Sequence, residues 1–362
     1  MNNPEINSYD LRPLWDEHIH THEPYPVDQT VEIFKALMQH FNYEKIVLNA
    51  LPSYGYADSF KALYVKSQIP GVYVNAGLSH YHDERDNAEA FLEQAKAFYA
   101  MGCDGFKMLE GKPDTRKADG IPLDSPVYDK FYGFLQENNL PLLMHLGDPW
   151  EFWDIDNIPK WALERGWLYD ETFVPLEGLR AEVEGFLTKF PRLKLTLAHF
   201  YFMSHDYDYA VDFMERFPNV CIDITPGSEM YVNFETDLPK WKAFFEKYAD
   251  RILYGSDRYN HYVPEEELEV NRCHAINMVR SFLEKENFFC VWKDRKMSGF
   301  ALSKDVTDKI YYKNAERIYG TTPRSVNMEL LKQGAKKCLE TDELSALDRQ
   351  NLETILHQST IK

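Results

Sequence analysis

Short apolar runs alternate with longer amphipathic stretches along the whole chain, and this alternation predicts the fold. The apolar runs are rich in aliphatic residues, which is typical of strands that are buried on both faces. The stretches between them have helical spacing, as at residues 27–40 and 88–102, and the second ends at Gly102, a common helix terminator. The predicted strands are Leu14–His20, Lys45–Leu51, Gly71–Leu78, Gly105–Leu109, Pro141–Leu146, Lys194–His199, Val220–Thr225 and Arg251–Asp257.

This repeat of strand and helix predicts parallel strands joined by right-handed crossovers. Repeated eight times, it closes a (β/α)8 TIM barrel, whereas an open doubly wound sheet is the rival topology. Two segments depart from the repeat, residues 148–176 after strand five and residues 321–362 at the C-terminus. We therefore expect one α/β barrel domain at residues 1–320 and a C-terminal helical extension, residues 321–362, packed on or beside it.

The long loop after strand five, residues 148–176, is rich in tryptophan. Long loops at the carboxyl ends of barrel strands often form lids or substrate walls. A packed cover over the barrel mouth, or a contact between subunits, is the alternative. The tryptophans are Trp150, Trp153, Trp161 and Trp167.

Composition and charge limit the classes of partner that we expect for this chain. The 362 residues are 44% hydrophobic and 15% aromatic, which is enough to form a large core without disulfides. A formal net charge of −18 repels phosphate backbones and anionic membranes, so we expect neither as a partner. The five cysteines have no paired spacing and the N-terminus has no signal-peptide pattern. These features predict reduced thiols and a cytoplasmic location.

Histidine and aspartate side chains end four of the predicted strands. His18 and His20 lie two residues apart, so a strand directs both imidazoles to the same side. His145, His199 and Asp257 end strands five, six and eight. Because the carboxyl ends of barrel strands surround one face, these side chains are expected to converge. Neutral imidazoles and a carboxylate suit Zn²⁺ or a similar divalent cation.

These motifs resemble those of the amidohydrolase superfamily, and in particular the group of the aminocarboxymuconate-semialdehyde decarboxylase type. Their order and spacing support the resemblance over most of the chain. The motifs are DEHIH (16–20), HLGDP (145–149), AHF (198–200), FPNVCIDIT (217–225), RILYGSD (251–257) and YYKNAERIYG (311–320).

The resemblance implies one divalent ion, most simply Zn²⁺, with Mn²⁺, Fe²⁺ and Co²⁺ as alternatives. His199 would lie near a bound water as a general base or an electrostatic partner, and Asp257 would share in proton transfer. Asp16 would orient a ligand imidazole, or it would only bond to the backbone. The implied ligands of the ion are His18, His20, His145 and Asp257.

Two cations are candidates for binding a substrate carboxylate. Lys107, on predicted strand four, would contact substrate, pair with Glu110 or Asp104, or form a carbamate that bridges two ions. Arg258 follows the metal-ligand candidate of strand eight, and a guanidinium can hold a carboxylate through two hydrogen bonds. A solvated position on its loop is the alternative for Arg258.

We expect a metal-dependent hydrolase in which an activated water attacks the amide, ester or lactone carbonyl of a small substrate. A non-oxidative carboxy-lyase or hydratase on the same site is the alternative. A barrel that binds a ligand without catalysis is a third interpretation. Homodimers are frequent among such folds, so a dimer is expected by analogy alone.

Overall fold

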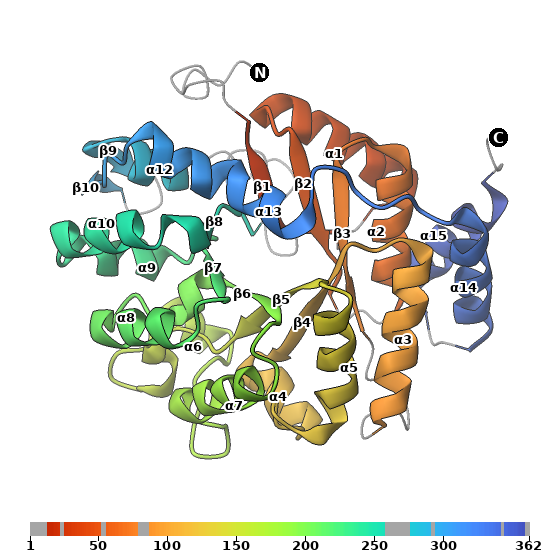
Figure 1. Cartoon of the computed structure of the whole chain (residues 1–362), viewed down its shortest axis with the longest axis horizontal. Helices are drawn as coiled ribbons and strands as arrows, with labels where there is room; N and C mark the ends of the chain where they lie inside the picture. Colours follow the sequence, from red (N-terminus) through yellow and green to blue (C-terminus); the bar gives the residue numbers. More distant parts are fainter. Residues whose placement is uncertain are drawn as a thin grey trace.

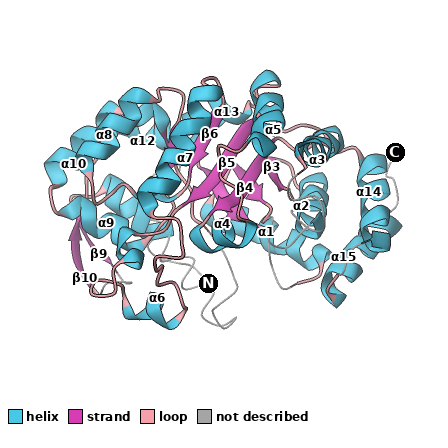
Figure 2. Cartoon of the chain, turned by 90° about the horizontal axis from the view of Figure 1, so that it is seen from below, coloured by secondary structure: helices cyan, strands magenta, loops and turns pink. Residues whose placement is uncertain are grey.

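Eight parallel strands, paired in chain order from β1 to β8, form the centre of the protein, and helices surround them (Figures 1 and 2). The Glu17 amide donates to the Tyr254 carbonyl at 3.0 Å, and the Asp257 amide donates to the His18 carbonyl at 2.8 Å. These bonds join β1 to the segment of β8 and close the sheet. The predicted barrel is therefore confirmed, and the alternative of an open doubly wound sheet is wrong. The computed structural model describes residues 13–21, 25–51, 56–78, 87–257, 276–290, 294–341 and 344–358.

The strands begin close to where the apolar runs predict, but several end earlier. After β6 and β8 the chain leaves the sheet before it reaches the candidate site residues His199 and Asp257. The site side chains of these strands therefore stand on turns at the carboxyl edge of the barrel. The observed strands are β1 (Trp15–His20), β2 (Lys45–Asn49), β3 (Val72–Gly77), β4 (Gly105–Gly111), β5 (Pro141–Leu146), β6 (Lys194–Leu197), β7 (Cys221–Asp223) and β8 (Ile252–Leu253).

The outer helices follow the amphipathic stretches. In α3, Asn87 caps the first turn by accepting from the amides of Glu89 and Ala90, and Gly102 ends the helix at φ +109°. None of the described helices combines the length and apolarity needed to cross a bilayer. The main helices are α1 (Val27–Phe41), α2 (Tyr56–Gln68), α3 (Ala88–Met101), α4 (Pro113–Asp119), α5 (Pro126–Glu137), α7 (Leu176–Lys189), α8 (Tyr207–Arg216), α9 (Ser228–Glu235) and α10 (Leu238–Lys247).

Helical residues cover the amino-terminal end of the barrel. They belong to α12 (Lys304–Asp308), the π-helical turn η8 (Lys309–Lys313) and α13 (Asn314–Tyr319). The Asn314 amide donates to the carbonyls of Ala249 and Ile252, which anchors this segment below β8. Apolar packing fills the barrel floor above α13 and involves Trp15, Val47, Tyr73, Cys221, Leu253, Ala315 and Ile318.

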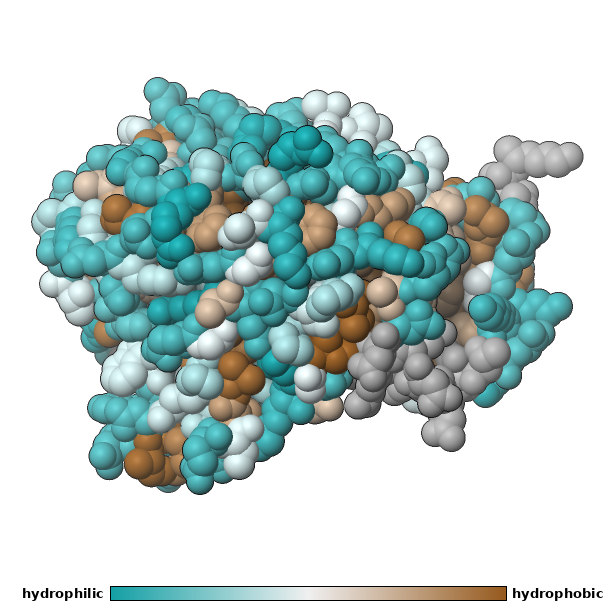
Figure 3. All heavy atoms as spheres, turned by 60° about the horizontal axis from the view of Figure 1, so that its bottom comes forward, coloured by the Kyte–Doolittle hydropathy of each residue, from teal (hydrophilic) through white to brown (hydrophobic). Residues whose placement is uncertain are grey.

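The long loop after β5 contains two short helices, η4 (Trp150–Trp153) and α6 (Lys160–Glu164). It has a small core of its own around Phe152, Ala162 and Tyr169. It also exposes large apolar side chains, and Figure 3 shows brown groups, one of them on a projecting lobe, in a mainly teal face. The exposed large apolar residues of the described chain are Ile155, Trp161, Leu163 and Phe289, the last on the β9 (Asn287–Cys290) and β10 (Arg295–Ser298) hairpin.

The C-terminal helices α14 (Met328–Thr341) and α15 (Ala346–His357) lie beside α2 and α3, outside the barrel (Figure 1). The Asn351 side chain accepts from the Val27 amide at 2.8 Å. The backbone before α14 runs against Gly102, where a Cβ atom would come within 2.4 Å of the Ser325 carbonyl oxygen. Contacts therefore tie the extension to the barrel helices, while a domain boundary at residue 320 stays a prediction.

Replacing Gly102 by alanine should lower the free energy of unfolding by about 2 kcal/mol or more, because a positive φ and a backbone clash act together. Gly120→Ala is the matched control, since Gly120 has φ +72° and open space around its Cβ position. That variant should lose only about 1 kcal/mol from backbone strain. Urea unfolding followed by circular dichroism measures both. Equal losses in the two variants would contradict the packing of the extension on this turn.

Candidate metal centre

The Asp223 carboxylate, fully buried at the end of β7, holds two of the predicted site histidines. Its Oδ2 accepts from His18 Nδ1 at 2.8 Å. Its Oδ1 accepts from the His199 amide at 2.8 Å and from the Thr225 hydroxyl at 2.5 Å. The Thr225 oxygen in turn lies 2.9 Å from His199 Nδ1, and its hydrogen is already given to Asp223. His199 Nδ1 must therefore donate, which leaves its Nε2 as an acceptor when the ring is neutral.

In their neutral forms, His18 and His20 present their unprotonated nitrogens to each other. His20 Nδ1 donates to the Asn49 carbonyl at 3.0 Å, as His18 Nδ1 does to Asp223. The two Nε2 atoms are 3.2 Å apart, and Asp257 Oδ1 lies 3.1 Å from His20 Nε2 and 3.5 Å from that of His18. Burial, and then the charge of Lys107, lowers the pKa of His18 well below its usual value. Three acceptors thus converge on one point.

This arrangement fits a divalent cation. Two nitrogens about 2.1 Å from a shared zinc ion, at an angle of about 100°, lie about 3.2 Å apart. The Nδ1 partners fix both imidazoles in the tautomer that a metal requires. His18, His199 and Asp257 also offer ligand atoms that all lie within 4.8 Å of one another. A cation at this point would neutralise the facing acceptors, and imidazole with carboxylate is a donor set typical of zinc.

His145 lies beside this group. Its ring centroid is 4.9 Å from that of His199, but its Nε2 is 3.0 Å from the Gly147 carbonyl oxygen and 3.6 Å from Asp148 Oδ1. Burial lowers the pKa of His145 to about 4, so the ring is neutral at pH 7. The assignment of His145 as a fourth ligand stays a prediction. His199, which we predicted to lie beside the ion and not to bind it, lies with His18 and Asp257 in the cluster that could hold a metal.

Backbone strain is concentrated at two of the site residues. His199, Phe200, Tyr201 and Phe202 all have φ between 47° and 55°, and Asp257 has φ 47°. Left-handed conformations cost non-glycine residues about 1–2 kcal/mol each. The Asp223 carboxylate holds the first residue of the turn, and Arg180 donates to the Phe202 carbonyl at its end. Such strain is common at functional sites, where the surrounding structure compensates it.

The interior of β1 differs from the regular alternation that the sequence predicted. Its register on β2 shifts between Asp16 and Ile19, which is a bulge-like irregularity. Asp16 Oδ1 accepts from the amides of His18 and Ser256, at 3.2 and 3.0 Å. Asp16 is therefore bonded to the backbone, the second of its two predicted roles, and Asp223 binds the His18 imidazole instead.

Lys107 lies beside the converging acceptors, is not among the residues that line the described pocket, and its contact with substrate stays a prediction. It is 1% exposed, and its Nζ is 3.2 Å from His18 Nε2. Burial lowers its pKa to about 8, against the opposing charges of nearby acidic groups. Asp104, one of its predicted partners, binds Lys66 at 2.5 Å. Arg258, the other predicted anion-binding residue, falls outside the described part of the chain.

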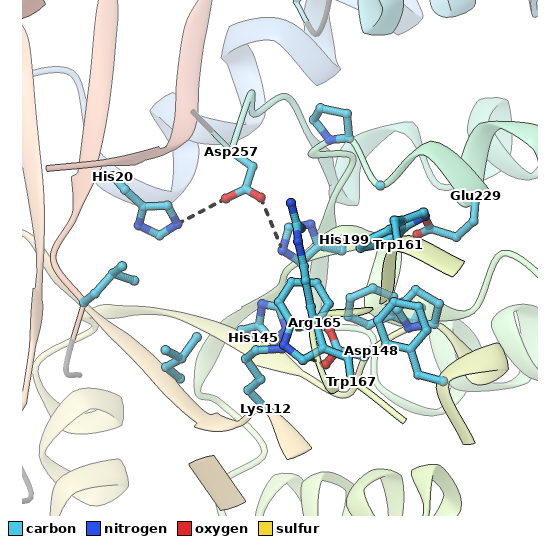
Figure 4. A pocket seen from close by; sticks show the side chains of 17 residues that line it. His20, Lys112, His145, Asp148, Trp161, Arg165, Trp167, His199, Glu229 and Asp257 are labelled. Atoms are coloured by element: carbon cyan, nitrogen blue, oxygen red, sulfur yellow. Dashed lines mark hydrogen bonds and ion pairs between the residues drawn. The ribbon is translucent and has the colours of Figure 1, made fainter. Parts of the chain in front are cut away.

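A pocket of about 380 Å³ opens over the group (Figure 4). Its floor includes His20, His145, His199 and Asp257. One wall comes from the long loop after β5, as the sequence predicted for this segment. The loop therefore has a packed core of its own and also lines the pocket. The loop residues that line the pocket are Asp148, Pro149, Phe152, Trp161, Arg165 and Trp167.

The amidohydrolase family model matches residues 15–321, which is most of the chain and includes every described strand of the barrel. The chain belongs to the amidohydrolase family. The family comprises metal enzymes with this barrel, so the recognition that the sequence motifs suggested is confirmed. No curated protein sequence gives a significant match to this amidohydrolase.

Several solved structures share the amidohydrolase barrel at low sequence identity, which establishes the fold alone. The 4-oxalomesaconate hydratase of Rhodopseudomonas palustris has a TM-score of 0.52 and 13% identity, covering 90% of this chain and 99% of that one. A probable 2-pyrone-4,6-dicarboxylic acid hydrolase of Acinetobacter baumannii has 0.50 and 13%, covering 85% and 100%. A dihydroxybenzoic acid decarboxylase of Polaromonas sp. JS666, with bound manganese, has 0.50 and 16%, covering 85% and 97%.

Sequence reasoning missed the most connected residue of this site, Asp223. It stands in the segment FPNVCIDIT, which contributed to the family resemblance, yet no role was derived for it. A carboxylate inside an otherwise apolar buried strand was the available signal, because such a group needs hydrogen-bond donors. The sequence also left unassigned Lys112, Asp148 and Arg165, which line the pocket.

Asp223→Asn should weaken the binding of Zn²⁺ by about tenfold to a hundredfold, because the His18 imidazole loses its carboxylate partner. Competition with a chromogenic chelator measures the affinity. Asp16→Asn is the matched control. Burial raises the pKa of Asp16 to about 7, so an amide of the same shape replaces a group that is already partly neutral. The control should bind zinc within a few-fold of the wild type, and equal losses in both variants would contradict the role of Asp223.

Proposed function

We propose that this amidohydrolase is a metal-dependent hydrolase that acts on the carbonyl of a small amide, ester or lactone. The observation that carries the proposal is the convergence of His18 Nε2, His20 Nε2 and Asp257 Oδ1, because His20 and Asp257 line an open pocket. One divalent ion, most simply zinc, would be held by these residues together with His145. A divalent ion at such a site supplies Lewis acidity and makes a bound water acidic enough to lose a proton near pH 7.

In this proposal Asp257 and His199 handle that proton. His199 Nε2 lies 3.9 Å from Asp257 Oδ2, and the Thr225 hydroxyl holds the opposite nitrogen of the ring. The unprotonated Nε2 can accept a proton from the attacking water and return it to the leaving group. The ammonium of Lys107 adds positive charge beside His18 and is buried.

A carboxy-lyase or hydratase on the same residues is the second candidate, and the aromatic wall of the pocket favours it. Phe152, Trp161 and Trp167 offer flat surfaces on which a planar unsaturated acid could stack. In that reaction a protonated His199 would deliver the proton that replaces the departing carboxyl group.

Replacing His199 by alanine should lower kcat by about a hundredfold to ten-thousandfold while the metal content changes little, because a proton acceptor is lost. Metal content by plasma mass spectrometry and steady-state kinetics report the two effects separately. His205→Ala is the control, since this exposed histidine contacts Trp150 away from the acceptor group. Loss of metal from the His199 variant would place this residue among the ligands and reject the assignment as a base.

Removing the metal with a chelator should abolish turnover, and one equivalent of Zn²⁺ per chain should restore it. Lactones, amides and unsaturated aromatic acids form the substrate panel. Incorporation of ¹⁸O from labelled water into a carboxylate product is expected for the hydrolase. Metal-dependent release of CO2 without such incorporation would instead select the lyase. Turnover that survives complete metal removal would reject both.

A further inference from the structure

The β1 strand contains one residue more than the stretch of β2 with which it pairs. Asp16 lies opposite Ile46 and Ile19 lies opposite Leu48, so two residues of β1 face a single residue of β2. An extra residue of this kind is a bulge, which changes the side to which the following side chains point and disrupts the ladder of backbone hydrogen bonds. This β1 bulge lies directly at the first histidine of the candidate metal centre.

The β1 bulge decides which side chains of the strand face the barrel interior. Before it, Trp15 packs in the barrel floor, and the Glu17 carboxyl group accepts from the Tyr319 hydroxyl at 3.4 Å. After it, the imidazoles of His18 and His20 converge on one point. A regular strand directs Glu17 and His18 to opposite sides. The bulge therefore brings both histidines to the interior, above a floor that is built from the other parity of the same strand.

The Asn49 side chain, fully buried on β2, supports the β1 bulge. Its Nδ2 donates to the Glu17 carbonyl at 3.0 Å and lies 3.4 Å from the Ile19 carbonyl oxygen. It also lies 3.1 Å from the carbonyl oxygen of Val47, the residue of β2 that faces the bulge. The amide thus contacts the backbone of β1 on both sides of His18, where the regular ladder is interrupted.

Two further side chains fix the orientation of the Asn49 amide. Its Oδ1 accepts from Asn75 Nδ2 at 2.8 Å, so its own NH2 group must face β1. Asn75 Nδ2 also donates to the Tyr319 hydroxyl at 2.8 Å, and this hydroxyl donates to the Glu17 carboxyl group. These hydrogen bonds form a ring that begins and ends on β1. Glu17, Asn49 and Asn75 are fully buried, so a bond lost from the ring leaves a polar group without a partner.

We propose that Asn49 is a positioning residue of the metal centre, which holds the β1 bulge and thereby sets the spacing of the two histidine nitrogens. Its side chain fixes the backbone around His18, and its own carbonyl accepts from His20 Nδ1 at 3.0 Å. The two Nε2 atoms are 3.2 Å apart, a spacing that suits one ion and that a relaxed bulge would change. Asn49 does not line the described pocket, so it acts through β1. The inference rests on the metal centre of the proposed function.

The first measurement compares two buried asparagines that both donate to backbone carbonyls. Asn49→Ala removes the support of the β1 bulge. Asn314→Ala is the matched control, since Asn314 Nδ2 donates to the carbonyls of Ala249 and Ile252 below β8. Both variants should lower the urea midpoint of unfolding, because each loses buried hydrogen bonds. Only Asn49→Ala should weaken the binding of Zn²⁺, by about tenfold to a hundredfold in competition with a chromogenic chelator.

The second measurement reports on the imidazoles directly and uses the metal-free full chain. Nitrogen-15 spectra of the histidine rings at about pH 8 show which ring nitrogen carries the proton. In the wild type, His18 and His20 should both be fixed in the Nδ1–H form, because Asp223 and the Asn49 carbonyl accept from these atoms. Asn49→Ala should give signals averaged between the two forms for at least one of these rings. Asn314→Ala should keep the wild-type signals.

A milder pair of variants tests the same ring of hydrogen bonds if the first variant does not fold. Tyr319→Phe removes the hydroxyl that accepts from Asn75 and donates to Glu17. It should weaken the binding of Zn²⁺ by about threefold to fivefold, which corresponds to the contribution of one neutral hydrogen bond. Tyr73→Phe is the matched control, because the Tyr73 hydroxyl donates to the Gly320 carbonyl at the same end of the barrel. This control should bind zinc as the wild type does.

Unchanged zinc affinity and ring spectra in a folded Asn49→Ala protein would overturn the proposal, and so would an equal loss of zinc affinity in Asn314→Ala. If Asn49→Ala does not fold, equal zinc affinities of Tyr319→Phe and Tyr73→Phe would overturn it instead. Neither measurement uses turnover, so the outcome is separate from that of the proposed function. Zinc binding that depends on Asn49, in a protein that hydrolyses none of the substrates, would reject the hydrolase alone. Hydrolysis by the wild type, with unaltered zinc binding in Asn49→Ala, would reject this inference alone.

Discussion

The geometry of the site depends on one buried carboxylate, that of Asp223. Its two oxygens accept from the His18 ring, from the His199 amide and from the Thr225 hydroxyl, and the last of these sets the tautomer of His199. A carboxylate without access to water is stable only when donors surround it, so the same bonds that satisfy it also orient the imidazoles. Both rings are therefore oriented before any ion or substrate binds.

The strained turn at His199 illustrates what this orientation costs and what offsets it. Four consecutive buried residues are left-handed, and no glycine relieves them. The turn stands on a barrel that is closed between β1 and β8 and packed from below by α13. A rigid frame of this kind can hold a strained segment, because relaxing the turn would break hydrogen bonds to Asp223 and expose aromatic side chains. The whole barrel, and not only the turn itself, therefore keeps these residues in the strained conformation.

Two parts of the chain supply different kinds of side chain to the pocket and the site below it. The strand ends supply imidazoles, a carboxylate and the buried Lys107, which form a polar floor. The loop after β5 supplies aromatic rings and the exposed Arg165, which form a wall with its own small core. Residues that take part in a reaction need a fixed position, which the strand ends provide. Residues that only contact a ligand can stand on a loop, provided that the loop has its own packing. Related barrels with different reactions can share the first part and differ in the second.

The sequence by itself determined the eight-stranded barrel, most strand and helix positions, and the face on which histidines and aspartate meet. These follow from local periodicity and from the rule that parallel strands end on one face, both of which can be read along the chain. Only the tertiary structure decided that Asp223 binds His18, 205 positions away, and that Asp16 bonds to the backbone. It also decided that Arg165 lines the pocket. The physical reason is that a hydrogen-bond partner across a barrel depends on strand register and closure. The register of β1 on β2 shifts between Asp16 and Ile19, and the pattern of apolar residues in the sequence does not predict this shift.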